Sequence, residues 1–348
     1  MIENFSCPLT LDDQQIITLA HGSGGQQTSK LIEKIFLPAF ANEHLALLHD
    51  GAVLNLPKNQ IAFTTDSYVV QPIFFPGGDI GKLAVTGTMN DLAMCGAKPY
   101  YLSCGFIIEE GFLQADLQRI VASMKIEADA QSVQIVTGDT KVIERQTGNN
   151  IFINTSGIGI RMVDYPINPL QIKAGDSMIL SGDVGRHGMA VMAKRQGLAF
   201  SSPLISDCAS LFPLVQALFH EGITIHCMRD LTRGGLATAL VELSESAKMD
   251  FSIEEKTILV SDAVNSACEI LGFDPLFVAN EGRFIAFVPE NQASQAVKII
   301  RRFSEGQQAS IIGQVISESL NPSTALKNSF GSQRYLHRLS GDQLPRIC

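Results

Sequence analysis

The chain has 348 residues, of which 45% are hydrophobic and 18% are charged, so it is long enough for two domains with separate cores and unlike a disordered chain. The net charge is −9 with no basic tract, which excludes a surface built to bind nucleic-acid phosphates. The seven cysteines form no C-x-x-C pair, which argues against a zinc ribbon or disulfide framework and favours a reducing cytoplasm.

Two further observations predict a protein that lies outside membranes. The first residues, MIENFSCPLTLDDQQIITLA, lack the basic start and apolar centre of a secretory signal. No apolar run approaches the ~18 residues that a membrane-spanning helix needs. We therefore expect no membrane partner.

The first half of the chain predicts an α/β (α+β) domain. Residues 1–40 should form an extension, a glycine-rich turn HGSGG at 21–25, and a helix capped by Thr28 or Ser29. Strand-like runs then alternate with helical patterns, which defines an expected domain over 41–162. The strands are expected at 61–67, 102–108, 133–139 and 151–160, and the helices at 81–95 and 114–130.

A proline-containing stretch at 161–176 predicts the boundary to a second α/β domain over 163–338. Its expected strands are 177–182, 283–288 and 309–316, and its expected helices lie within 182–197 and near 208–221, 235–247 and 262–271. The last residues, 339–348, are rich in glycine, proline and polar residues and predict a mobile tail that ends in Cys348.

Several carboxylates occur where the predicted strands end. Asp66 and Asp139 each close a strand-like run, and Asp50 precedes a Gly-Ala turn. Carboxylate oxygens are suited to Mg²⁺, which commonly bridges a protein to nucleotide phosphates. Taken alone, each of these three residues is more often an ordinary turn carboxylate than a metal ligand.

Asp91 is more informative because it lies inside an apolar helical pattern. Its neighbours Leu83, Val85 and Met89 predict a buried helix, in which an unpaired carboxylate would be costly. Lys82, Thr86 and Asn90 follow at steps of four and form one polar stripe beside it.

Other motifs allow both a functional and a structural interpretation. Lys141 in TGDTKV could meet a phosphate or lie in solvent, and Glu281 in NEG could be a base or a turn carboxylate. HGSGG could bind an anion through its backbone or only form the turn, and Arg233 in DLTRGG is placed for an anion before a second helix. These residues predict an acidic α/β enzyme that binds Mg²⁺ and phosphate.

The motifs together resemble the HypE family of hydrogenase-maturation factors along nearly the whole chain. They are LAHGSGG (19–25), TDSYVV (65–70), FFPGGDIGKLAVTGTMNDLAMCGAKP (74–99), TGDTKV (137–142), DLTRGG (230–235), NEG (280–282) and the terminal PRIC (345–348). The resemblance implies a two-domain fold of the aminoimidazole ribonucleotide synthetase type, with the N-terminal domains of a homodimer pairing into a barrel-like core.

The resemblance also implies a reaction and partners. A HypE protein uses ATP with Mg²⁺ to dehydrate a carboxamide on its C-terminal cysteine, here Cys348, to a thiocyanate. The cyano group goes to the iron of a [NiFe]-hydrogenase. HypF supplies the carbamoyl group, and the HypC–HypD complex is the iron scaffold.

The matching motifs also imply roles for individual residues. Asp66, Asp91 and Asp139 would bind metal and phosphate, with Asp50 as a further metal ligand, and Lys141 would contact phosphate or the carboxamide. Glu281 would be the base. The remaining residues implied at the site are His21, Gly24, Gly25, Asn90 and Gly138, followed by Asp230 and Arg233.

Two other functions remain open at the level of sequence. A selenophosphate synthetase of the same superfamily would need a reactive cysteine in the glycine-rich loop, and HGSGG has none. A non-catalytic carrier of the carbamoyl or cyano group would not need the TGDTK and NEG motifs.

Overall fold

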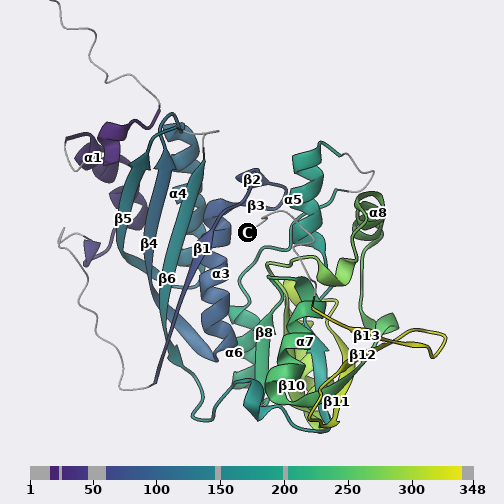
Figure 1. The fold of residues 1–348 in the computed structure, drawn as a ribbon. Coiled ribbons are helices and arrows are strands. Elements are labelled where there is room, and N and C mark those ends of the chain that lie inside the picture. Colours follow the sequence, from purple (N-terminus) through teal and green to yellow (C-terminus); the bar gives the residue numbers. More distant parts are fainter. Residues whose placement is uncertain (1–15, 23–25, 46–59, 146–149, 199–202, 339–348) are drawn as a thin grey trace, which may run out of the picture.

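The computed structural model describes residues 16–22, 26–45, 60–145, 150–198 and 203–338. Within them the chain forms two large sheets, one in each half of the sequence, with helices against them (Figure 1). The expectations for Gly24, Gly25, Asp50, Cys348 and the tail 339–348 fall outside the described residues.

The N-terminal half contains a four-stranded sheet. Its strands are β1 (Ile61–Tyr68), β4 (Ala97–Glu109), β5 (Gln134–Ile143) and β6 (Ile151–Arg161), and its main helices are α3 (Ile80–Met94) and α4 (Gln114–Ala130). The order β1-β6-β4-β5 places β1 and β5 at opposite edges. Only β4 and β5 are parallel, and α3 and α4 lie against one face of the sheet (Figure 1).

Shorter elements surround this sheet. The N-terminal segments η2 (Leu19–Gly22), α1 (Gln26–Leu31), η3 (Ile32–Phe36) and α2 (Leu37–Phe40) lie near β5 and α4. A small hairpin of β2 (Phe74–Phe75) and β3 (Gly78–Asp79) leads into α3. Thr28 and Ser29 lie inside α1, so the predicted helix cap at these residues was wrong because the helix begins earlier, at Gln26.

The C-terminal half contains a seven-stranded sheet in the order β13-β12-β9-β11-β7-β10-β8. The strands are β7 (Asp176–Leu180), β8 (Cys227–Asp230), β9 (Met249–Glu254), β10 (Phe284–Pro289), β11 (Ser310–Glu318), β12 (Thr324–Lys327) and β13 (Gln333–Leu336). The helices are α5 (Arg186–Gln196), α6 (Phe212–His220), α7 (Gly235–Ala247), α8 (Asp262–Leu271) and α9 (Glu290–Ile300), with single turns at η5 (Pro169–Gln171), η6 (Glu255–Thr257), η7 (Pro275–Phe277) and η8 (Ser304–Gly306).

Strand β10 shows how this sheet is packed on both faces. Ile285 and Phe287 belong to the core shared with α7, whereas Phe284, Ala286 and Val288 belong to the core shared with α6 and α9. A strand that is covered on both sides reads as a continuous apolar run, as FIAFV does here.

Helix α3 lies between the two halves and is buried on nearly all sides. Asp79 caps its N-terminus by accepting hydrogen bonds from the amides of Gly81 and Lys82 at 2.7 and 3.0 Å. All of its residues except Lys82 and Asp91 are buried. Its middle packs in the N-terminal core, and Ala93 and Met94 pack in the C-terminal core, which confirms the predicted buried helix.

The face of the four-stranded sheet opposite α3 and α4 exposes apolar side chains. Ile61, Phe63 and Ile107 are 54%, 68% and 44% exposed. Strand alternation places them away from the helices, since Thr64 on the other face of β1 contacts α3. Exposed apolar patches of this kind are typical of interaction surfaces.

Gly81→Ala tests the contact between α3 and α4. A Cβ at this position would lie 2.4 Å from the backbone oxygen of Ile120, so one helix must move. We expect the free energy of unfolding to fall by about 1–3 kcal/mol. Helix propensity alone predicts the opposite sign, a gain of about 1 kcal/mol. Urea unfolding measures the difference, and a stabilised variant would contradict the close packing.

Candidate active site between the two sheets

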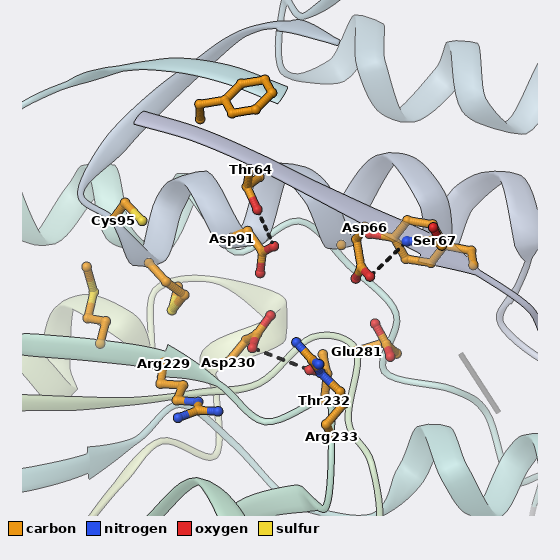
Figure 2. A pocket seen from close by; sticks show the side chains of 15 residues that line it. Thr64, Asp66, Ser67, Asp91, Cys95, Arg229, Asp230, Thr232, Arg233 and Glu281 are labelled. Carbon is orange, nitrogen blue, oxygen red and sulfur yellow. Dashed lines mark hydrogen bonds between the residues drawn. The ribbon is translucent and has the colours of Figure 1, made fainter. Parts of the chain in front are cut away.

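A cavity of about 480 Å³ lies where β1 and α3 face the end of β8 and the loop after it (Figure 2). Its polar lining comes from both halves of the chain, and four carboxylates belong to it. The lining residues are Phe63, Thr64, Asp66, Ser67, Tyr68, Gly87, Asp91, Met94, Cys95, Met228, Arg229, Asp230, Thr232, Arg233 and Glu281.

The N-terminal half contributes Asp66 from β1 and Asp91 from α3. The hydroxyl of Thr64 donates to Asp91 Oδ2 at 2.8 Å, and the amide of Ser67 donates to Asp66 Oδ1 at 2.8 Å. Burial raises the pKa of Asp91, and the nearby charge of Asp66 raises it further, against the hydrogen bond from Thr64. The pocket therefore holds carboxylates that favour a cation beside them.

The C-terminal half contributes Asp230 at the end of β8 and the arginines on either side of it. Burial, followed by the charge of Asp91, raises the pKa of Asp230 to about 7. Arg229 forms an ion pair with Glu242, while Arg233 is exposed just before α7. Two successive glycines, Gly234 and Gly235, have φ of +67° and +63° and turn the chain into that helix.

Glu281 comes from the segment before β10 and is only 3% exposed. The residues on either side of it are held firmly. Asn280 Oδ1 accepts the Gly185 amide at 2.7 Å, and Asp207 Oδ2 accepts the Gly282 amide at 3.1 Å. Arg283 then pairs with the buried Asp183 at 2.6 Å. The main chain that carries Glu281 is therefore fixed before any ligand arrives.

The carboxylates fit a magnesium ion that is shared with a phosphate ligand. Among the described residues, no three His, Cys, Asp or Glu side chains are placed to hold a metal ion by themselves. Mg²⁺ usually takes one or two carboxylates and completes its shell with phosphate oxygens and water. Asp66 and Asp91 suit that arrangement, because the charge of Asp66 raises the pKa of Asp91 and a cation beside them would offset that repulsion.

The other predicted site residues lie at the opposite edge of the sheet. Asp139 and Lys141 are exposed on β5, with Lys141 Nζ 3.7 Å from Asp139 Oδ2. A smaller cavity of about 170 Å³ lies between Gly138, Asp139 and the N-terminal helices. Within one chain, the predicted residues thus form two groups, since β5 and β1 are separated by the width of the sheet.

His21 belongs to the group near β5. It is 8% exposed, its Nδ1 accepts the Thr18 amide at 3.0 Å, and burial lowers its pKa. Segment η2, which carries His21, packs beside β5. A buried, hydrogen-bonded histidine of this kind orders the N-terminal segment next to the TGDTK motif.

Asn90 does not line the large cavity, although it was expected in the nucleotide site. It is 2% exposed and points toward the C-terminal half. Its Nδ2 donates to Ala209 O at 3.0 Å, and its Oδ1 accepts the Leu211 amide at 2.7 Å.

Several cavity residues were not singled out from the sequence. Thr64 and Asp66 share one face of β1, so the period-two rule applied to Asp66 would have found Thr64. Arg229 precedes Asp230 on a strand of only four residues, which gives too little pattern to detect. Cys95 places a thiol at the cavity wall, and burial with the charge of Asp91 raises its pKa, which keeps it protonated.

Comparisons with known proteins agree with this geometry. Models of the N-terminal and C-terminal domains of AIR synthase related proteins match residues 48–161 and 173–321. Carbamoyl dehydratase HypE of Azotobacter vinelandii is 44% identical over 332 residues, which covers 95% of this chain and 97% of that protein. The chain belongs to the HypE family. The predicted family and the two-domain α/β fold are thereby confirmed.

Two solved structures of the HypE family are similar in shape. A crystal structure of HypE in complex with ATP superposes with a TM-score of 0.91 at 44% identity and covers 95% of this chain and 99% of its own. A HypE–HypF complex gives a TM-score of 0.77 at 44% identity, with coverage of 89% and 99%. In the part of the chain that the structure describes, no helix has the length and apolar character to cross a membrane.

Asp230→Asn tests whether the buried charge of Asp230 destabilises the folded protein. The pKa of Asp230 is raised to about 7, so the ionised side chain destabilises the folded protein above that pH. In metal-free buffer, we expect the variant to unfold at a higher temperature than the wild type at pH 8. The gain should shrink as the pH falls from 7 and vanish below the usual carboxyl pKa of 3.8. A gain that is independent of pH would contradict the buried charge.

Proposed function

We propose that the chain uses ATP to dehydrate a carboxamide carried on the thiol of Cys348, giving a thiocyanate whose cyano group becomes a ligand of the iron in a [NiFe]-hydrogenase. The observation that carries this proposal is the convergence of Asp66, Asp91, Asp230 and Glu281 on one cavity in a chain of the HypE family. The similarity to a HypE structure that contains ATP supports the nucleotide as substrate.

The chemistry needs the groups that the cavity supplies. An amide oxygen is a poor leaving group, so the γ-phosphoryl group of ATP is first transferred to it. This step gives ADP and an O-phosphorylated imidate and releases the first of the two N–H protons. A base then takes the remaining N–H proton, the C–O bond breaks, and inorganic phosphate leaves as the C≡N bond forms. The oxygen lost from the carboxamide therefore ends in phosphate.

Glu281 is the base in this scheme. Its main chain is fixed on both sides, and its carboxylate lies at the wall of the cavity, which suits removal of one proton from a bound amide. Asp66 and Asp91 would hold Mg²⁺, with Asp230 beside them in the cavity, and the ion would neutralise phosphate charge. Arg233, with the N-terminus of α7, would orient the phosphates.

The sheet topology supports a homodimer in which each site uses two chains. Asp66 and the cavity lie at the β1 edge, whereas Asp139 and Lys141 lie at the β5 edge. Two sheets that meet through their exposed apolar faces and close into a barrel would bring β1 of one chain beside β5 of its partner. Asp139 and Lys141 would then complete the phosphate site of the partner chain, and the exposed Phe63 would be covered.

The partners follow from the same reaction. HypF would deliver the carbamoyl group to Cys348, in agreement with the similarity to a HypE–HypF complex. The HypC–HypD complex would accept the cyano group on iron. A cytoplasmic location, where thiols stay reduced, suits a thiol carrier.

Intact mass spectrometry tests the reaction. The protein is carbamoylated by HypF and carbamoyl phosphate, separated from HypF, and then given Mg-ATP. We expect Cys348 to gain one carbamoyl group and to lose one water only with ATP, while Cys348→Ala gains nothing. Retention of the carbamoyl group under ATP would show a carrier without dehydratase activity, and an unmodified Cys348 would exclude the thiocyanate scheme.

Glu281→Gln tests the role of Glu281 as the base in dehydration separately from carbamoylation of Cys348. Glutamine keeps the size of the side chain but cannot take the proton. We expect Cys348 to be carbamoylated at the normal rate, whereas ATP-dependent loss of water slows by about 10²–10⁴-fold. Normal dehydration by this variant would remove Glu281 from the role of base.

A mixture of two inactive variants tests the shared site. Asp66→Asn and Asp139→Asn are unfolded and refolded together, so that about half of the dimers contain one of each chain. If each site takes Asp66 from one chain and Asp139 from the other, one site in every mixed dimer is intact, and about a quarter of the wild-type rate returns. No recovery in confirmed mixed dimers would place both residues in the site of a single chain.

A further inference from the structure

The main chain of Glu281 contacts the N-terminal half of the molecule through the side chain of Asn90 on helix α3. Asn90 Nδ2 lies 3.0 Å from Ala209 O and 3.5 Å from Glu281 O, and Asn90 Oδ1 accepts the Leu211 amide at 2.7 Å. The side chain is 2% exposed, so these bonds form away from water. A single amide thus contacts both the loop before α6 and the segment before β10.

The loop and the segment also hold each other. The Ala209 amide donates to Glu281 O at 3.4 Å, and Asp207 Oδ2 accepts the Gly282 amide at 3.1 Å. The approach is so close that a Cβ on Gly282 would lie 1.9 Å from Asp207 O. Movement of Ala209 therefore moves Glu281, and Asn90 fixes Ala209.

Asn90 and Asp91 are successive residues of the same buried helix. Asp91 faces the cavity, where it accepts a hydrogen bond from Thr64 (Figure 2). Asn90 instead contacts the segment of Glu281. Helix α3 is packed in the cores of both halves, so it cannot shift one of these residues without the other. Asp91, which is expected to bind the cation, and Asn90, which contacts the segment of the expected base, thus share one rigid helix.

We propose that Asn90 is a positioning residue, which sets the location of Glu281 relative to Asp91 and thereby controls the dehydration step without touching the nucleotide. This proposal rests on the proposed function, in which Glu281 removes the amide proton. Because proton transfer requires the base within hydrogen-bond reach, a displacement of about 1 Å costs about 100-fold in rate.

Thr86 provides a matched control. It lies one turn before Asn90 on the same face of α3, is fully buried, and contacts Cys208 Sγ at 3.3 Å in the same loop. It makes no hydrogen bond to Ala209 or Glu281 in the described structure. Thr86→Val therefore removes one buried polar contact to the loop but keeps the bonds from Asn90 that fix Ala209 and Leu211.

The experiment compares Asn90→Ala with Thr86→Val, and uses Asn90→Ser if the alanine variant fails to fold. Three quantities are measured on each: ATP affinity, the single-turnover rate of water loss from carbamoylated Cys348, and hydrogen exchange of the peptide that contains Gly282. For Asn90→Ala we expect ATP affinity within about threefold of wild type, a rate lower by about 100-fold, and faster exchange. Thr86→Val should keep its rate within about threefold.

Three results would overturn the proposal. An Asn90 variant with a normal rate would show that its bonds do not position the base, as would equal losses in both variants. A parallel loss of ATP affinity would instead place Asn90 in the nucleotide site. If the wild type itself loses no water, the proposed function fails. Hydrogen exchange at Gly282 then still decides whether Asn90 holds the segment, because exchange does not depend on the reaction.

Discussion

The burial of helix α3 between the two halves is the constraint on which the rest of the structure depends. Both cores pack against it, so any polar group on it must find a partner inside the protein. Asp91 accepts a hydrogen bond from the hydroxyl of Thr64, and Asn90 forms hydrogen bonds with backbone groups of the C-terminal half. The helix thus joins the two halves and at the same time sets the geometry of the cavity between them.

The electrostatics of the cavity follow from the same burial. Burial raises the pKa of both Asp91 and Asp230. The charge of Asp66 raises both further and that of Asp91 adds to the rise at Asp230, while Arg229 and Arg233 oppose these effects only in part. A polyphosphate would be repelled by such a wall unless a divalent cation came with it, and the cation in turn relieves the repulsion among the carboxylates. Binding of a metal–nucleotide pair, as proposed above, would therefore relieve the electrostatic cost of placing these carboxylates together.

The sequence predicted individual helices and strands well, but it predicted poorly which of them lie next to one another. Periodicity predicted 114–130, 235–247 and 262–271 as helices, and α4, α7 and α8 have those bounds. Periodicity carries no information on strand order, so it could not show that Asp66 and Asp139, both at strand-like runs, occupy opposite edges of one sheet. The polar stripe that contains Asn90 was visible, but its partners lie over 100 residues away in the sequence. The family motifs single out residues by chemistry and not by local pattern, so they named residues of both groups without showing that the groups lie apart.

The most direct test of this account follows the oxygen atom of the carboxamide. Cys348 is carbamoylated with a group that contains oxygen-18, excess reagent is removed, and Mg-ATP is added for a single turnover. If ATP phosphorylates the amide oxygen, the released inorganic phosphate carries the label and the protein keeps the cyano group. Label that appears in water, or that remains on the protein while ATP is hydrolysed, would contradict the mechanism.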